Sequence, residues 1–466
     1  MLPKKVKYLI LGAGPTGLGA ALRLQELGET DFLVLEKEPY AGGLATTFTD
    51  EKGFLWDIGG HVQFSHYHYF DQVMERALGA EGWLHHQRES WVWMHHRFIP
   101  YPFQNNIRHL PAAALEKCLE GIREIYRHKP ETPQNFAEWI LAGMGKGIAG
   151  EFMFPYNFKV WAYPPAEMTY HWIGERVATV DLERIERNIA EGRDDLSWGP
   201  NNTFGFPKFG GTGGIWKKVA GMIHPEKIRL SEPVTGIEVN QKSVQSGTGE
   251  IYQYERLLST LPLDIMTRLC SGLPSGLVQR AGQLVHSSTN IIGIGLKGSP
   301  KPELKTKCWM YFPESNCPFY RVTVFSNYSP NNVPDSSRNW SLMTEISESP
   351  AKPVNRETLL EETIQGLLNT RLIDSREDIV STWQYHTDYG YPTPYLGRNA
   401  ILQEVLPSLQ ALDIYSRGRF GAWKYEVSNQ DHSFMQGVEW ASHMLLGEEE
   451  VTAFYPERIN AAGKKI

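Results

Sequence analysis

Three glycines and one carboxylate near the N-terminus have the residue types and the spacing needed to bind a dinucleotide. Gly12, Gly14 and Gly17 fit the pattern G-x-G-x-x-G, and Glu36 stands 24 residues after Gly12. In such a pattern the first glycine permits a sharp turn, the second lets backbone approach a pyrophosphate, and the third lets helix and strand pack closely. Helix-start amides attract phosphate, and Glu36 can accept hydrogen bonds from a ribose diol. The alternative interpretation is a glycine-rich turn without a ligand.

Two glycine pairs further along the chain indicate which dinucleotide this is. Gly42 and Gly43 follow the ribose carboxylate closely, and Gly59 and Gly60 precede His61. Paired glycines mark places where backbone comes close to another group. This arrangement suits a flavin better than a nicotinamide cofactor, because the second pair would bring backbone to the isoalloxazine ring. Taken alone, His61 is better explained as a hydrogen-bonded loop histidine.

The composition excludes several classes of protein. The 466 residues are 41% hydrophobic and 21% charged, which is typical of a soluble globular protein with room for two or three domains. A net charge of −7 argues against general nucleic-acid binding. No apolar run approaches the roughly 18 residues of a membrane span, and Lys4 and Lys5 lead directly into the first expected strand, so we expect no signal peptide. The four cysteines form no CxxC pair, which predicts no metal site and a cytoplasmic location.

The glycine motif sits between elements that would position it. Residues 8–11 form a short apolar run typical of a buried parallel strand, 18–27 a small-residue helix that ends at Gly28, and 32–35 a second buried strand. Residues 431–446 are expected to form a late helix whose N-terminus again faces the cofactor.

The rest of the chain alternates between helical and strand patterns. Residues 91–101 alternate apolar and polar side chains as one strand, and about 108–200 show helical periodicity. The glycine-rich stretch 199–214 reads as a loop. Several short strands are expected within 228–262, longer strands between 290 and 384, a helix near 356–371, and a last strand with a glycine turn at 414–421.

These patterns predict an α/β protein with three parts. A Rossmann-like FAD-binding domain of the glutathione-reductase type is expected in 1–90 with about 205–265 and 412–466. A helical-bundle insertion is expected at about 108–200. An antiparallel β-sheet substrate domain is expected in about 91–107 with 266–411.

Many segments of the chain, in order, resemble those of one known family. The segments that carry the resemblance are 59–62, 64–67, 101–106, 155–161, 174–177, 198–201, 210–214, 319–321, 325–329, 390–394 and 429–433. Together they are similar to the UDP-galactopyranose mutases of the eukaryotic type, and the match extends over nearly the whole chain.

The resemblance implies a reaction without net redox change. UDP-galactopyranose and UDP-galactofuranose interconvert on reduced FAD, whose N5 acts as nucleophile on the anomeric carbon. It implies catalytic roles for His61, Arg176 and Arg321. The two guanidinium groups would hold the diphosphate that leaves, and His61 would act partly through its backbone. The alternative for either arginine is a surface ion pair.

The resemblance also implies two sets of binding residues. For FAD the expected residues are Gly12, Gly14, Gly17, Glu36, Gly43, Gly60, His61, Arg419, Asn429, Gln430 and Ser433. For the UDP-sugar they are Tyr101, Phe103, Gln104, Asn157, Trp161, Arg176, Asn201, Trp309, Tyr311, Arg321, Tyr391, Tyr425 and Asn429. Arg88 and Ser90 match positions that contact NADPH, which is therefore expected as the reductant.

Some positions depart from the family pattern. Gln63 stands where an aliphatic residue is expected, 179–181 differ in a substrate flap, and Gly205 and Lys424 stand where arginine is usual. An insertion is missing between about 329 and 340, which leaves the subunit count open, a homo-oligomer included. Because the flap differs from the family pattern, a mutase that acts on a different nucleotide sugar is an alternative interpretation. Two further alternatives share the scaffold: a flavin oxidase related to amine and protoporphyrinogen oxidases, and a non-catalytic FAD-binding protein.

Overall fold

A parallel strand–helix–strand unit at the start of the chain carries the glycine motif. The computed structural model describes residues 3–128, 131–174, 176–196, 199, 202–461 and 465. Strand β1 (Lys4–Leu11) leads into helix α1 (Pro15–Glu26) and then β2 (Phe32–Leu35), which pairs parallel to β1. Leu9, Ile10 and Leu11 are fully buried, as expected for a central strand with helices on its face.

The first large sheet is built around β1. The described residues form an eight-stranded sheet in the order β13-β10-β11-β12-β1-β2-β9, and β19 pairs with β12. The pairs around β1 and β12 are parallel, whereas β10, β11 and β12 form an antiparallel extension. The additional strands are β9 (Ile228–Arg229), β10 (Val234–Glu238), β11 (Ser243–Ser246), β12 (Ile251–Ser259), β13 (Cys270–Ser271) and β19 (Ile414–Ser416).

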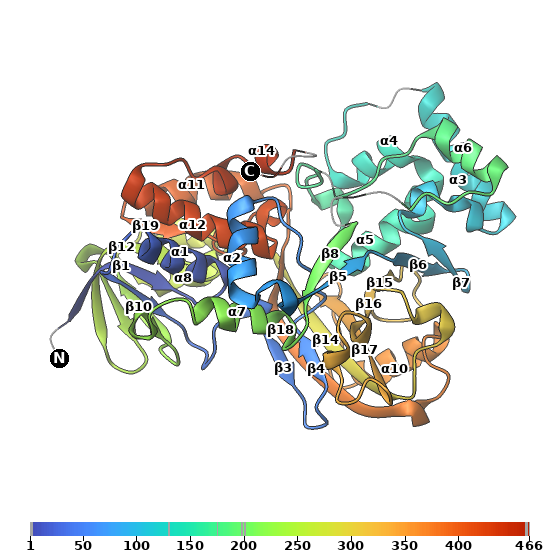
Figure 1. Cartoon of the computed structure of the whole chain (residues 1–466). Helices are drawn as coiled ribbons and strands as arrows, with labels where there is room; N and C mark the ends of the chain where they lie inside the picture. The colour runs from blue at the N-terminus through green and yellow to red at the C-terminus, as the bar shows by residue number, and fades with distance from the viewer. Residues whose placement is uncertain are drawn as a thin grey trace.

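Helices cover this sheet and bring the C-terminal part of the chain onto it. α12 (Gln430–Leu446) packs directly against α1, so the two helix starts lie at the same side of the sheet. In Figure 1 these helices lie at the left over β1 and β12, with α11 (Arg398–Gln410) beside them. The other helices of this part are α2 (His68–Leu78), α7 (Gly211–Ala220), α8 (Leu263–Leu269), α9 (Ser275–Ala281), α13 (Val451–Phe454) and α14 (Pro456–Ile459).

The second large sheet lies at the lower right of Figure 1, beside α10 (Leu359–Asn369). In the described part of the chain it has seven strands in the order β18-β14-β17-β16-β15-β6-β7. Their bounds are β6 (Ser90–Met94), β7 (Arg97–Pro100), β14 (His286–Lys297), β15 (Trp309–Tyr311), β16 (Arg321–Val324), β17 (Asn339–Glu348) and β18 (Ile379–Pro392). The sheet is antiparallel, as predicted, except that β15 and β6 run parallel.

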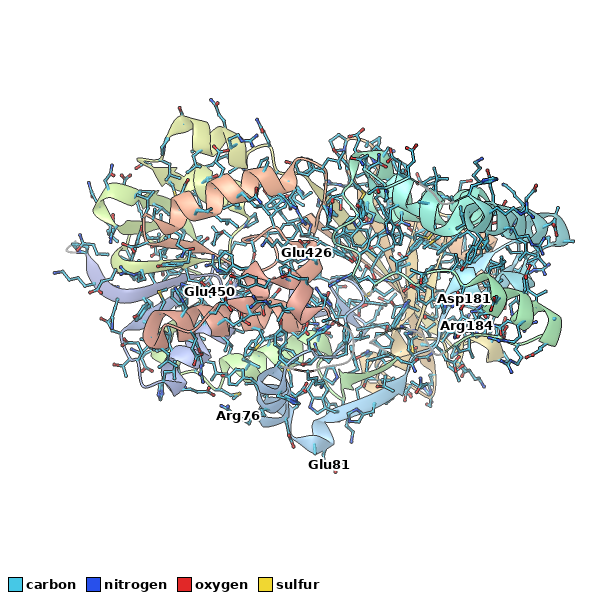
Figure 2. The ribbon with its side chains drawn as sticks, turned by 90° about the horizontal axis from the view of Figure 1, so that it is seen from above. Arg76, Glu81, Asp181, Arg184, Glu426 and Glu450 are labelled. Carbon is cyan, nitrogen blue, oxygen red and sulfur yellow. The ribbon has the colours of Figure 1, made fainter. Side chains whose placement is uncertain are left out.

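A group of helices lies above the second sheet, at the upper right of Figure 1. It consists of α3 (Ala112–Arg127), α4 (Phe136–Ile148), α5 (Phe154–Trp161) and α6 (Leu182–Glu191), with a π-helical turn at Ala149–Met153. One core holds it together, with Ile122, Ile140 and Phe152 buried in it. Asp181 caps α6 by accepting a hydrogen bond from the Arg184 amide at 3.1 Å, and Figure 2 shows the two residues close together.

Two sequence predictions about local structure were wrong. Residues 199–214 contain strand β8 (Thr203–Pro207), which pairs with β5 (Trp83–Gln87), and the start of α7. The partner strand lies more than a hundred residues away, so its pairing left no local signal. Residues 91–101 form two strands, because His95 and His96 have positive φ and reverse the chain between β6 and β7. A short hairpin joins β3 (Thr47–Thr49) to β4 (Leu55–Asp57).

Candidate active site

A cavity of about 690 Å³ lies where the two large sheets meet the start of α12 and the segment after α5. It brings together most of the residues that the sequence singled out. From the predicted set, its lining contains Gly12, Gly14, Glu36, Gly43, Gly60, His61, Arg88, Tyr101, Arg176, Trp309, Tyr311, Arg321, Tyr391, Arg419, Tyr425, Asn429, Gln430 and Ser433.

One end of the cavity has the geometry of a dinucleotide site. A side chain at Gly17 would place its Cβ 1.8 Å from the Gly12 carbonyl oxygen, so only glycine permits this close turn. Helix α1 starts directly after Gly14 with no acidic residue in its first turn, so its positive end borders the cavity. The buried Glu36 carboxylate accepts the Ala13 amide at 2.7 Å and the Glu38 amide at 3.0 Å. Burial raises the pKa of Glu36.

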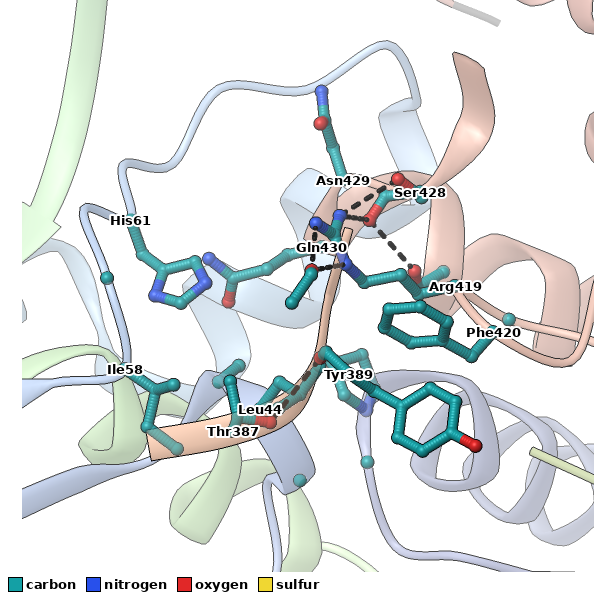
Figure 3. Close-up of a pocket in the computed structure, with 18 of the residues that line it drawn as sticks. Leu44, Ile58, His61, Thr387, Tyr389, Arg419, Phe420, Ser428, Asn429 and Gln430 are labelled. Atoms are coloured by element: carbon teal, nitrogen blue, oxygen red, sulfur yellow. Dashed lines mark hydrogen bonds between the residues drawn. The ribbon is translucent and has the colours of Figure 1, made fainter. Parts of the chain in front are cut away.

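His61, Arg419 and Gln430 surround the middle of the cavity, as Figure 3 shows. The Arg419 guanidinium donates to the Gly390 carbonyl at 2.8 Å and to Ser428 Oγ at 2.9 Å, and it lies 4.9 Å from the centre of the Tyr391 ring. Burial lowers the pKa of His61 to about 4. Nδ1 of His61 is buried and has no hydrogen-bond partner among the described residues. This imidazole is therefore neutral at pH 7.

A single row of residues across the second sheet forms the opposite wall. Tyr311 on β15 is in register with Arg321 on β16, which is in register with Glu345 on β17. The row continues through Ile291 on β14 to Tyr385 on β18, and all five residues line the cavity. Residues in register across neighbouring strands share one face of the sheet, so strand pairing places this arginine and its neighbours.

Arg321 is held by a carboxylate in a two-pronged ion pair. Its Nε and Nη2 each donate to the Glu345 carboxylate at 2.7 Å. The Glu345 side chain is only 2% exposed. Burial raises the pKa of Glu345, but the Arg321 charge and the hydrogen bonds from Arg321, Gly60 and Tyr320 together outweigh burial and hold that pKa below its usual value. Both groups are therefore charged, and the guanidinium has a fixed orientation.

Arg176 reaches the cavity from a segment between α5 and α6. Its Nη2 donates to the main-chain carbonyl of Glu426 at 2.6 Å, and its guanidinium lies 5.8 Å from the centre of the Tyr425 ring. Nη1 is buried without a hydrogen-bond partner in the described part of the chain. The Glu426 carboxylate is itself bound by both Nη atoms of Arg398 at 2.8 Å. Glu426 lies near the middle of the molecule in Figure 2.

Several predicted residues lie outside the cavity lining. Gly17 acts through packing of α1 against the β1 turn. Phe103, Gln104, Asn157 and Trp161 belong to the buried layer behind the wall, where Gln104 Nε2 donates to the Ala178 carbonyl and Trp161 packs edge-on against Tyr425. Their roles at a nucleotide base stay predictions. Asn201 lies outside the residues that the structure describes.

Of the two predicted NADPH residues, Arg88 lines the cavity and Ser90 lies outside its lining. The Arg88 guanidinium lies 5.7 Å from the centre of the Tyr101 ring. Ser90, on β6, is buried, and its carbonyl accepts the Tyr101 amide at 3.1 Å. Trp309 Nε1 donates to the Tyr311 hydroxyl at 2.6 Å in the same wall.

The sequence reasoning missed several polar residues around the cavity. Glu345 is the most important, and its signal was an acidic residue inside a strand, β17, whose other residues before Glu348 are uncharged. A second is the pair in which His66 Nδ1 and Asp431 Oδ2 lie 2.7 Å apart at the start of α12. Asp431 could also serve with His66 and His432 as a set of metal ligands, because one ligand atom from each lies within 4.8 Å of the others.

Two of the departures from the family pattern meet in space. Gln63 and Gly205 form an isolated bridge, with the Gln63 amide donating to the Gly205 carbonyl at 2.9 Å and the reverse bond at 2.8 Å. Nε2 of Gln63 is buried and unpaired among the described residues. Lys424 donates to the Ala453 carbonyl at 2.6 Å and lines a separate cavity.

Comparisons with known proteins identify the family of this chain. The profile of the flavin containing amine oxidoreductase family matches residues 15–424. A solved structure of reduced UDP-galactopyranose mutase is 50% identical, with a TM-score of 0.95, and the match covers 100% of this chain and 98% of that one. The chain belongs to the UDP-galactopyranose mutase family.

Other similarities show only the shared scaffold. A structure of a putative protoporphyrinogen oxidase from Exiguobacterium sp. 255-15 is 16% identical with a TM-score of 0.67, covering 93% of this chain and 98% of that one. The inactive all-trans-retinol 13,14-reductase of Danio rerio is 40% identical over 77 residues, which are 16% of this chain and 11% of that protein. Membership of the mutase family confirms the predicted α/β flavin-binding fold and the prediction of an enzyme of the mutase type. No described helix is both long and apolar enough to cross a membrane.

The residues at the cavity fit the flavin that this family uses. Backbone at Gly14 and Gly43 comes so close that a Cβ at Gly43 would lie 3.2 Å from the Gly14 Cα, which leaves a surface without side chains for a pyrophosphate. Glu36 provides acceptors for a ribose. His61, Arg419 and Gln430 surround the space between the dinucleotide end and Arg321.

Proposed function

We propose that this protein interconverts UDP-galactopyranose and UDP-galactofuranose with bound FAD in its reduced state and no net redox change. The observation that carries the proposal is the placement of Arg176 and Arg321 in the same cavity as the dinucleotide motif. The 50% identical mutase, aligned over the whole chain, supports the choice of substrate. When bound and reduced, FAD would supply a nucleophilic N5 for the sugar's anomeric carbon.

Charged and phenolic side chains would hold the nucleotide that leaves. A diphosphate dianion is best stabilised by donors that stay charged, as guanidinium groups do. Tyr391 and Tyr425 stand beside Arg419 and Arg176 respectively and would add hydroxyl donors. Burial raises the pKa of Tyr425, so this phenol keeps its proton and remains a donor near pH 7.

His61 would contribute through the position of its loop. Its neutral imidazole, with a pKa lowered to about 4 by burial, has no proton to donate from a charged form at pH 7. We therefore assign the loop 59–62 the task of shaping the flavin side of the cavity.

The remaining predictions belong to the same proposal. NADPH would reduce the flavin through a site that includes Arg88 and Ser90, and a cytoplasmic location and a homo-oligomer are compatible with it. Anaerobic mixing with NADPH should bleach the flavin absorbance, and a flavin that keeps its colour in excess NADPH would exclude this reductant.

The family profile favours one second candidate, a flavin oxidase, because the profile is that of flavin containing amine oxidoreductases. Two arginines in the cavity would repel a protonated amine and would not serve an apolar substrate, so they disfavour an oxidase of either kind. The decisive experiment incubates the dithionite-reduced holoenzyme with UDP-galactofuranose and follows the pyranose by chromatography. Conversion only after reduction is the expected result. Oxygen consumption with an amine would contradict the proposal in favour of an oxidase. Conversion of another nucleotide sugar only would contradict it in favour of a mutase with that substrate.

A further inference from the structure

A buried carboxylate behind Arg321 connects two parts of the cavity wall. Glu345 Oε1 accepts from Arg321 Nε at 2.7 Å and from the Gly60 amide at 2.9 Å. Its Oε2 accepts from Arg321 Nη2 at 2.7 Å and from the Tyr320 hydroxyl at 2.8 Å. Four donors from two separate segments therefore share one side chain.

The surrounding backbone is built closely around this carboxylate. A Cβ at Gly59 would lie 3.2 Å from Glu345 Oε2, and one at Gly60 would lie 3.2 Å from Oε1. Side chains at these two positions would crowd the carboxylate, and Gly59 also has a positive φ of 88°, which favours glycine. Strand register places Glu345 directly opposite Arg321, so the pair does not depend on a chance rotamer.

The ion pair leaves one edge of the guanidinium available. Nε and Nη2 of Arg321 face Glu345, whereas Nη1 forms no hydrogen bond within the described residues, and Arg321 lines the cavity. A carboxylate that binds one edge of a planar guanidinium fixes the direction of the other edge.

We propose that Glu345 is a positioning residue that orients Arg321 toward the leaving diphosphate and fixes the loop 59–62 against the flavin side of the cavity. This inference rests on the function proposed above. Glu345 is not a catalytic residue here, because its four bonds are to the protein itself.

The substitution Glu345→Gln tests this role with little change of shape. All four partners of the carboxylate are donors, so the amide NH₂ of glutamine would face donors and lose two of the four bonds. The affinity of reduced holoenzyme for UDP should fall about 10- to 100-fold, the range for loss of a hydrogen bond to a charged group. The flavin absorption spectrum should shift because the Gly60 amide is released. Glu345→Asp, which keeps the charge, should recover part of the affinity.

Two controls separate positioning from a general structural effect. Glu348→Gln changes a carboxylate on the same strand that pairs with Arg356 outside the cavity, and it should leave UDP affinity and spectrum unchanged. The second control is a double-mutant cycle with Arg321→Ala. If Glu345 acts through Arg321, then Glu345→Gln should reduce UDP affinity less than about threefold in the Arg321→Ala enzyme, since coupled residues are not additive.

The outcomes are distinguishable. Two results would overturn the role of Glu345 and leave the proposed function intact. The first is that Glu345→Gln lowers UDP affinity equally in the wild-type and Arg321→Ala enzymes. The second is that the Glu345→Gln holoenzyme binds UDP with wild-type affinity. If Glu345→Gln fails to bind FAD, the same test can be made by comparing how much Glu345→Asp lowers UDP affinity in the wild-type enzyme and in the Arg321→Ala enzyme. A wild-type holoenzyme that does not bind UDP would overturn the proposed function and this inference with it.

Discussion

Arg321 and Arg176 line the same cavity, but different structures support them. Arg321 sits on a strand inside a seven-stranded sheet of the described chain and makes a two-pronged bond to a carboxylate. Arg176 sits between two helices, and its described partner is the carbonyl of Glu426. One arginine is therefore charge-compensated before any ligand arrives, whereas the other forms no ion pair with a described carboxylate.

For the diphosphate binding proposed above, this difference predicts two distinct contributions. The compensated Arg321 provides a fixed direction, since its orientation is set by strand register and by Glu345. The uncompensated Arg176 would provide net positive charge to the proposed diphosphate site, and charge interactions are strongest where the surroundings exclude water. Arg321 would thus set the orientation of the bound diphosphate, and Arg176 would supply most of the net positive charge.

The largest expected effect is on the support behind Arg176. Arg398→Ala would leave the Glu426 carboxylate buried without its ion-pair partner, because the Arg398 and Glu426 side chains are 1% and 12% exposed. Removal of one partner of a buried pair lowers the free energy of unfolding by about 3–5 kcal/mol. Chemical denaturation of the holoenzyme measures this. Arg338→Ala at an 83% exposed position should change it by less than about 0.5 kcal/mol, and similar values for the two variants would contradict the assignment.

The next effect concerns Arg321 itself. Arg321→Ala should reduce transition-state binding by roughly 2–4 kcal/mol, because it removes a desolvated charge contact and leaves Glu345 unpaired beside the diphosphate. Steady-state kcat/KM with UDP-galactofuranose and reduced enzyme measures the loss. An unchanged kcat/KM would exclude Arg321 from the diphosphate site.

Lysine substitutions distinguish geometry from charge. Lysine keeps a point charge but has no planar fork. Arg321→Lys should therefore bind UDP more weakly than Arg176→Lys, on the order of tenfold, which corresponds to one hydrogen bond to a charged group. Titration of UDP into both reduced variants gives the ratio. Equal affinities would show that the two arginines do not differ in this way.

The smallest effect is a pH dependence that only one arginine should show. The pKa of Glu345 is held below its usual value of 4.5 when folded, so the stability it contributes is fully present above pH 4.5 and is lost as pH falls through the lowered value. The stability difference between wild type and Glu345→Gln should therefore shrink in thermal melts as pH drops from 5 to 3. The difference between wild type and Arg176→Ala should stay constant, because the carbonyl of Glu426 does not titrate. If both stability differences changed with pH in the same way, the proposed difference between Arg321 and Arg176 would be wrong.

The residues that could be predicted from the sequence are those whose role is encoded locally. Gly12, Gly17 and Glu36 belong to one strand–helix–strand unit, and the start of α12 lay within one residue of the expected position. Glu345 could not be assigned in the same way. Its role follows from register with a residue 24 positions earlier, and nothing near it in the chain specifies which residue it pairs with. Strand β8 was missed for the same reason, because it pairs with β5, which lies far away in the sequence.

The row from Tyr311 through Arg321 to Glu345 has a consequence for how the chain tolerates length changes. A single inserted residue within β16 or β17 would turn either the guanidinium or its carboxylate to the opposite face of the sheet. Insertions in the exposed segment 334–338, between β16 and β17, fall outside that row and away from the mostly buried segment 325–333, so they should leave the pairing intact. Loop grafts there should be accepted by a working enzyme, whereas a one-residue frame error in either strand should abolish nucleotide binding even if the protein still folds.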